Sequence, residues 1–142
     1  MKCQVIVEIE GRQRASEEGG EDVISYSTTG ELYKKDSCYY LVYKEGDNTG
    51  MDGATTKLKV DEGRVELKRI GPGGIKQRFQ KDKLEHSLYK TPQGNFPLGV
   101  LPSKVEADLT DKGGSINLEY ELKVEQETIS YNQLSVVVSL LK

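Results

Sequence analysis

The chain has 142 residues, a formal net charge of −3 and a pI near 5.3, which disfavours bulk attraction to nucleic acid or to an anionic membrane. It contains three alanines against twenty-seven β-branched residues, and this ratio disfavours helices because Val, Ile and Thr fit a pleated sheet better. The length suits one domain over residues 1–142, and no stretch approaches the about 18 consecutive apolar residues of a membrane-spanning helix.

Apolar and polar residues alternate with period two along most of the chain, which predicts short strands with one buried and one solvated face. The first strand runs through Val5, Val7 and Ile9. It could be mistaken for a signal peptide, but Glu8 and Glu10 interrupt its apolar run, so we expect a cytoplasmic protein.

A long polar loop is predicted over residues 12–22, and irregular strands over about 21–33 and 37–45. The remaining alternations are Leu58/Val60, Val65/Leu67, Ile75/Phe79, Leu84/Leu88, Phe96/Leu98/Val100, Val105/Ala107/Leu109, Ile116 to Val124 and Leu134 to Leu140. Each of them predicts one more strand.

Short turns rich in Gly, Pro, Asn and Asp separate these strands, and such connections join antiparallel neighbours. They lie at 47–50, 61–63, 71–74, 81–82, 91–94 and 111–114. About 8 to 10 strands in up-and-down order form either a sandwich or a closed barrel, and one antiparallel β-barrel is favoured because closure removes exposed strand edges. Pro97 cannot donate to a ladder, so we expect a bulge, bend or gap near it.

The cysteines and the histidine offer no metal site. Cys3 and Cys38 lie far apart without ligand spacing, and the chain holds one histidine, so a Cys/His zinc site cannot be assembled. We expect reduced thiols, because disulfides are rare in the cytosol. The sequence predicts neither a metal nor a cofactor.

Several segments carry a family resemblance. They are CYYLVYKE at 38–45, TTKLKV at 55–60, VELKRIG at 65–71, Phe79, YKTPQG at 89–94 and GSINLEY at 114–120. Together they resemble the YwiB-like family of small uncharacterised bacterial proteins, over nearly the whole chain. The resemblance implies a calycin-like, lipocalin-related β-barrel in the cytoplasm of low-GC Gram-positive bacteria. It implies no catalytic or binding residues.

Polar residues that interrupt the inward faces are candidates for a ligand site. The alternation predicts that the even positions of 54–60 and the odd positions of 65–69 and 75–79 face inward. By the same reasoning the polar residues predicted to face inward are Arg69, Gln77, His86, Tyr43, Glu45 and Tyr120. A barrel of about eight strands can hold one small ligand, and the planar fork of Arg69 would bind a carboxylate or phosphate. The structural alternative is that Arg69 is buried and paired with Glu45.

Catalytic motifs are missing from the sequence. As a general base, His86 would need a nucleophile and an orienting carboxylate, but Ser87 and Glu85 point to the opposite face of a strand. The glycine-rich run at 71–74 lacks the helix and the Lys-Ser/Thr of a phosphate loop. We therefore expect a protein that is not an enzyme.

The segment 57–90 is basic within an acidic chain, with ten Lys and Arg against five Asp and Glu. Its side chains predicted to project outward are Lys57, Lys59, Arg64, Lys68, Lys76, Arg78 and Lys83. This face would contact RNA or an acidic protein, or it is a solvated face whose lysines keep the strands from pairing with other chains.

The sequence thus favours a cytoplasmic, non-catalytic binding module for a small, anionic ligand in or at the mouth of the barrel, with no membrane partner. The alternative is a protein- or RNA-interaction module that uses the basic face, with a solidly packed interior. The sequence does not predict an oligomeric state.

Overall fold

Ten antiparallel strands form a nearly closed barrel in the computed structural model, which describes residues 2–15, 19–44, 54–71 and 74–141. The strands are β1 (Lys2–Arg14), β2 (Glu21–Lys35), β3 (Cys38–Lys44), β4 (Thr55–Asp61), β5 (Arg64–Ile70), β6 (Ile75–Gln80), β7 (Glu85–Thr91), β8 (Gly94–Thr110), β9 (Gly113–Val124) and β10 (Glu127–Leu140). The predicted all-β, up-and-down architecture is confirmed. Within the described ranges, no helix is long and apolar enough to cross a bilayer.

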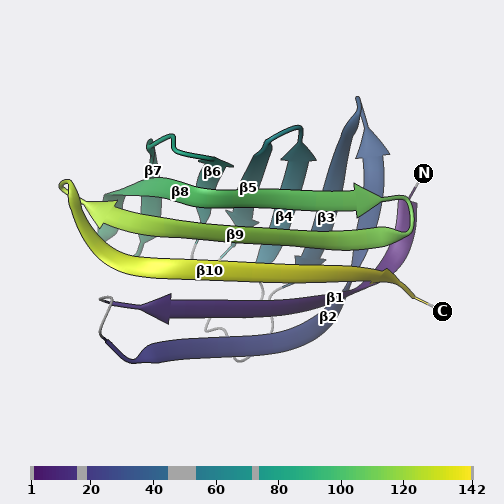
Figure 1. Ribbon diagram of the computed structural model, residues 1–142, viewed down its shortest axis with the longest axis horizontal. Helices are drawn as coiled ribbons and strands as arrows, with labels where there is room; N and C mark the ends of the chain where they lie inside the picture. The colour runs from purple at the N-terminus through teal and green to yellow at the C-terminus, as the bar shows by residue number, and fades with distance from the viewer. Residues whose placement is uncertain (1, 16–18, 45–53, 72–73, 142) are drawn as a thin grey trace.

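The sheet has its two edges in the middle of the chain. Its strand order is β6-β5-β4-β3-β2-β1-β10-β9-β8-β7, so β1 pairs with β10, and β6 and β7 are the two edge strands. In Figure 1 the long strands β8, β9, β10 and β1 form a front layer, β2 curves to the back, and β3 to β7 lie behind. We call the line along which β6 and β7 face each other the seam.

Cross-strand rows of inward side chains make the core. Leu32, Leu41, Leu58 and Leu67 are directly opposite one another on β2 to β5, and Gln77 ends the row on β6. The inner faces of β1, β9 and β10 add the fully buried Val5, Val7, Ile116, Leu118 and Val136. The predicted parity at 54–60, 65–69 and 75–79 is confirmed by these registers.

The predicted loop over 12–22 is wrong at both ends, because β1 continues to Arg14 and β2 begins at Glu21. Arg12 explains the extension. Its guanidinium lies 2.7 Å from carboxylate oxygens of both Glu10 and Glu21, so the polar side chains bridge the two strands. Polarity there marks a solvated strand face and not a loop.

Pro97 does not cause the predicted irregularity. Pro97 pairs in regular register with Leu88. The ladder between β8 and β9 begins only at Gly99, so at Pro97 no hydrogen bond to a β9 carbonyl is lost through the missing N–H. The register shift on β8 lies instead between Pro102 and Lys104. The gap in the barrel lies one strand farther on, on the other side of β7.

Candidate functional site

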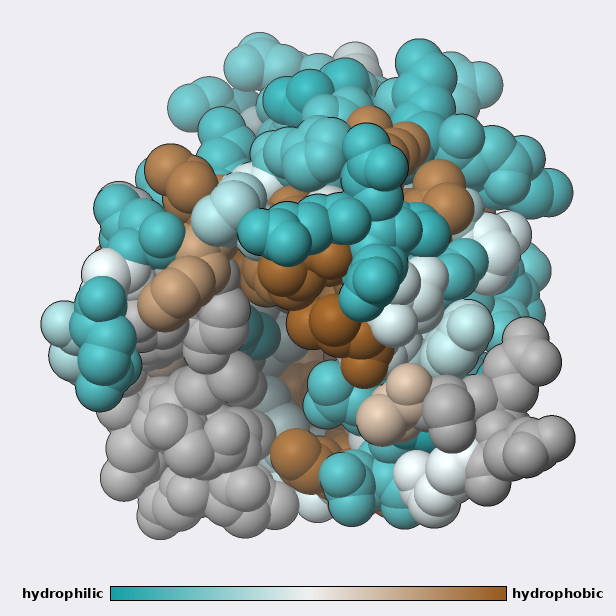
Figure 2. Space-filling view, turned by 90° about the vertical axis from the view of Figure 1, so that its left-hand side faces the viewer, coloured by the Kyte–Doolittle hydropathy of each residue, from teal (hydrophilic) through white to brown (hydrophobic). Residues whose placement is uncertain are grey.

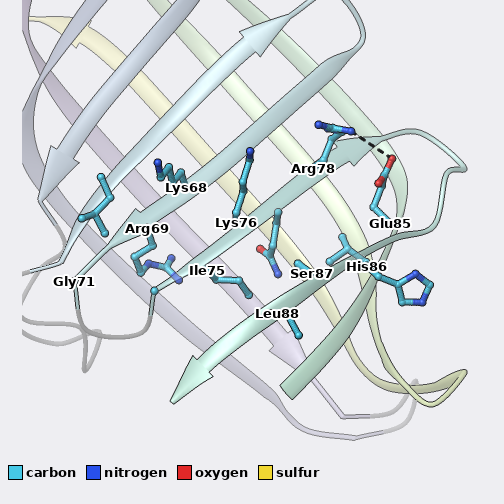
Figure 3. Close-up of a pocket in the computed structure, with 14 residues that line it drawn as sticks. Lys68, Arg69, Gly71, Ile75, Lys76, Arg78, Glu85, His86, Ser87 and Leu88 are labelled. Atoms are coloured by element: carbon cyan, nitrogen blue, oxygen red, sulfur yellow. Dashed lines mark ion pairs between the residues drawn. The ribbon is translucent and has the colours of Figure 1, made fainter. Parts of the chain in front are cut away.

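A groove of about 620 Å³ follows the seam, and β5, β6 and β7 supply most of its lining. We call it the seam groove. Lys68, Lys76 and Arg78 line its outer side, and Arg69 reaches it from the inner face of the barrel (Figure 3). Gln77, which is opposite the buried Leu67, lines the groove from the same inner face. The groove therefore joins basic residues predicted for the outer face with polar residues predicted for the interior.

Arg69 and Gln77 owe their positions to the alternation of β5 and β6. Arg69 follows the buried Leu67 by two residues, and Gln77 lies directly opposite Leu67. Gln77 is only 8% exposed, although its amide is polar. Tyr120 on β9 packs its ring edge-on against Phe79 of β6, with centroids 4.8 Å apart. The two sides of the barrel thus meet next to the groove.

Tyr120 is a partly buried residue that packs against the hydrophobic core. Burial raises its pKa to about 12, and the nearby positive charge of Arg69 acts in the opposite direction. Tyr120 therefore binds its proton more tightly in the folded chain than in the unfolded chain. Its contribution to the free energy of unfolding is complete below pH 10.0 and is lost as the pH rises through about 12.

We expect the difference between the ultraviolet titrations of the wild type and Tyr120→Phe to show a tyrosinate step with a midpoint of about 12. Because the charge of Arg69 lowers this pKa, Arg69→Gln should move the same step to higher pH. A Tyr120 step near its ordinary value of 10.0 would contradict the burial of this tyrosine, and a downward move in Arg69→Gln would contradict the effect of the Arg69 charge.

The predicted inward orientation of His86 is wrong. Glu85 and Ser87 are directly opposite Val100 and Leu98, which are 1% and 8% exposed, so the odd positions of β7 face inward. His86 is exposed, and its ring points away from β6 in Figure 3. The apolar residues around this edge strand lie on its outer face, so their alternation predicted the wrong face to be the inner one.

Apolar side chains reach the surface near this edge. Leu84 and Leu88 are 46% and 54% exposed, against the prediction that both face inward. Figure 2 views the side of the molecule on which β7 lies and shows hydrophobic side chains around a hollow. Leu88 and the equally exposed Ile70 both line the seam groove.

Ser87 is a groove residue that the sequence argument did not select. Its Oγ is buried, and it makes no hydrogen bond to any residue that the structure describes. The signal lay in the pairing of β7 with the apolar alternation Leu98/Val100, which fixes the inward positions of β7. A buried hydroxyl without a partner costs about 1–3 kcal/mol, which a ligand acceptor would offset.

Tyr43 and Tyr120 are predicted ligand residues that do not line the groove, whereas the exposed His86 does. Tyr43 is buried in the hydrophobic core cluster. Glu45 lies outside the described residues, so the predicted Arg69–Glu45 pair stays a prediction. In the described parts of the chain, no group of three or more His, Cys, Asp and Glu is placed to hold a metal ion.

The basic outer residues of β4, β5 and β6 form two cross-strand rows. Lys57, Lys68 and Lys76 make one row, which has no directly adjacent acidic residue in register among the residues that the structure describes. In the other, Lys59 is opposite Glu66, and Glu66 lies 3.1 Å from Arg78.

The remaining basic residues lie beside these rows. Arg64 is 3.4 Å from Asp61, and Lys83 is exposed in the turn before β7. Arg78 also approaches Glu85 across the seam, at 4.0 Å. The lysine row is therefore the part of the basic face that neighbouring carboxylates balance least.

Comparisons with known proteins agree with this fold. A family profile described as "Domain of unknown function (DUF1934)" matches residues 7–136. The uncharacterized beta-barrel protein YwiB of Bacillus subtilis (strain 168) is 27% identical over 136 residues, which is 96% of this chain and 94% of that protein. The crystal structure of the ywiB protein from Bacillus subtilis superimposes with a TM-score of 0.86 at 23% identity, covering 99% of this chain and 94% of that one. The predicted YwiB-like resemblance is confirmed.

Proposed function

The chain belongs to the DUF1934 family, a domain of unknown function, and we propose that it is a non-catalytic binding module that holds a small anionic ligand in the seam groove. The observation that carries this proposal is the charge of the groove. Lys68, Arg69, Lys76 and Arg78 line it, and Glu85 is the carboxylate among the described residues that do so. A ligand with one or more carboxylates or phosphates matches this lining.

The inner wall offers directional polar groups beside the charge. The Gln77 amide can donate and accept hydrogen bonds, and the buried Ser87 hydroxyl can donate one. The volume of about 620 Å³ lies within the range of roughly 300–1,000 Å³ that small-molecule sites occupy. As part of the same proposal, the barrel is of the calycin and lipocalin type and the protein acts in the cytoplasm.

A binding role is favoured over a catalytic one because the reactive residues diverge. His86 points away from β6, while the Ser87 hydroxyl is buried on the inner face of the same strand. A histidine general base has to reach the hydroxyl that it activates. The two neighbours on β7 cannot act as such a pair.

Native mass spectrometry of protein purified from its own host should show a retained mass above that of the chain. Isothermal titration with inorganic phosphate and with small di- and tricarboxylates should then give saturable binding. Removing one charged hydrogen bond is worth about 1.5–3 kcal/mol, so Arg69→Gln should weaken that binding by roughly ten- to a hundredfold.

Arg64→Gln is the matched control, since Arg64 lies on the outer face of the same strand beside Asp61. It should bind the probe anions as the wild type does. Equal weakening in both variants, or unchanged affinity in Arg69→Gln, would refute a ligand site at the inner wall of the groove.

A further inference from the structure

The lysine row of the outer face ends at an open sheet edge. Lys57 on β4, Lys68 on β5 and Lys76 on β6 are directly opposite one another, and within the described ranges β6 has a ladder to β5 alone. Like charges in directly opposite positions destabilise a sheet. Among the described residues, no carboxylate lies within ion-pair distance of Lys68 or Lys76. The row lacks an acidic strand at its open end.

The seam keeps this edge accessible over most of its length. The turn between β6 and β7 is held against β8, because the Asp82 N–H donates to the Pro102 carbonyl at 2.8 Å, and the Lys83 N–H closes the turn on the Gln80 carbonyl. Beyond the turn the seam groove separates β6 from β7. An edge strand presents unpaired N–H and C=O groups, which can accept another strand.

Lysines on an edge strand also occur where a protein only prevents pairing with other chains. The flanks of this groove argue against that purpose here. Ile70 and Leu88, each 54% exposed, lie on either side of it. If the lysines served only to prevent pairing with other chains, apolar side chains exposed to water would bring no benefit, whereas a bound segment would bury them.

We propose that the free edge of β6 binds an extended acidic segment of a partner protein, which adds as a strand in the seam groove. The added strand would place a carboxylate directly opposite Lys76 and so continue the row with an opposite charge. Its alternate side chains would face inward beside Ile75 and Gln77, which favours small or β-branched residues. This goes beyond the proposed function, because it uses the edge and the outer row and does not require Arg69.

A nucleic acid fits this surface less well. Tyr33 and Tyr40 already stack on each other, with centroids 5.0 Å apart. Lys57 lies 5.0 Å from the Tyr40 ring and Lys2 lies 5.5 Å from the Tyr33 ring. These ring faces are therefore engaged, whereas binding of single-stranded nucleic acid uses open aromatic faces for base stacking.

A second copy of this chain is also disfavoured as the added strand. Pairing β6 with β6 of another copy would bring two strands with the same basic residues, Lys76 and Arg78, edge to edge. An acidic partner is the occupant that removes the like-charge row.

The test is fluorescence anisotropy with a labelled peptide of alternating glutamate and threonine, as long as the 7 residues of β7. We expect saturable binding that weakens steeply as salt rises. The double change Lys68→Glu and Lys76→Glu should weaken it by about tenfold or more, because attraction opposite the edge becomes repulsion. Lys112→Glu, in the exposed turn between β8 and β9, is the matched charge-reversal control and should leave binding unchanged.

A second peptide, N-methylated at alternate residues on its pairing edge, separates strand addition from simple charge attraction. It keeps every carboxylate but loses backbone donors, so its affinity should fall. Equal binding of both peptides, tighter binding of a single-stranded RNA, or indifference to the lysine reversals would overturn the proposal. Arg69→Gln should still bind the first peptide, so a failure of the small-anion site is recognised separately.

Discussion

Gly114→Ala is expected to lose about 3 kcal/mol or more of unfolding free energy, because both backbone strain and overpacking act at this position. Gly114 has a φ of +146°, a conformation that L side chains rarely adopt. A Cβ at this position would also collide with the backbone carbonyl oxygen of Asp108 on the neighbouring strand. Backbone atoms cannot move aside as the end of a flexible side chain can.

The position of Gly114 makes this loss global. The residue is opposite Leu109 of β8 and Val138 of β10, so a shift in its backbone disturbs both ladders that hold β9. Thermal and denaturant unfolding of the variant measure the loss. Gly11→Ala is the control, since a Cβ there meets no atom within 4 Å. Gly11→Ala should keep or slightly raise stability, because alanine lowers the conformational entropy of the unfolded chain. A similar loss in both variants would show that collision and strain at Gly114 do not decide the effect.

Much of the fold follows from the sequence because burial enforces period two on each strand. The registers Thr56 opposite Arg69 and Leu67 opposite Gln77 show that parity from single strands carries across the sheet. Two turns escaped prediction because their left-handed positions are not glycines. Asp36 and Ser37 turn between β2 and β3 with φ of 52° and 68°. Glu125 and Gln126 turn between β9 and β10 with φ of 51° and 72°.

The seam could not be predicted, and neither could the groove that depends on it. Edge and central strands alternate in the same way, so the sequence does not reveal which consecutive pair fails to make a ladder. Leu88 on β7 and Leu84 just before it show the consequence, because their apolar side chains lie on the outer face. Arg69 and Gln77 were identified as inward polar residues, but their role as groove lining follows only from the separation of β6 and β7.

Phe79→Ala is expected to destabilise the protein by about 3–5 kcal/mol, the range for removing a buried aromatic ring. Phe79 is 0% exposed and belongs to β6, which has a ladder on one side only. Its ring packs edge-on against Tyr120 across the barrel interior. The side chain thus attaches the edge strand to the opposite wall of the barrel, on the side where the described residues provide no second ladder.

Phe96→Ala provides the matched control, because the chain has two phenylalanines and Phe96 is 51% exposed near the start of β8. Substitutions at such exposed positions usually change stability by less than about 0.5 kcal/mol. Denaturant unfolding should separate the two variants clearly. An equal loss in both would mean that the ladder to β5 alone holds β6.

Hydrogen exchange locates the effect of Phe79→Ala within the fold. The amides of β6 should lose protection before those of β1 and β10, which have ladders on both sides. Because Gln77 and Lys76 lie on β6, the same variant should also weaken binding of phosphate or carboxylate probes and of the acidic peptide. Loss of β6 protection with unchanged binding of both probes would place both ligands elsewhere than at the seam.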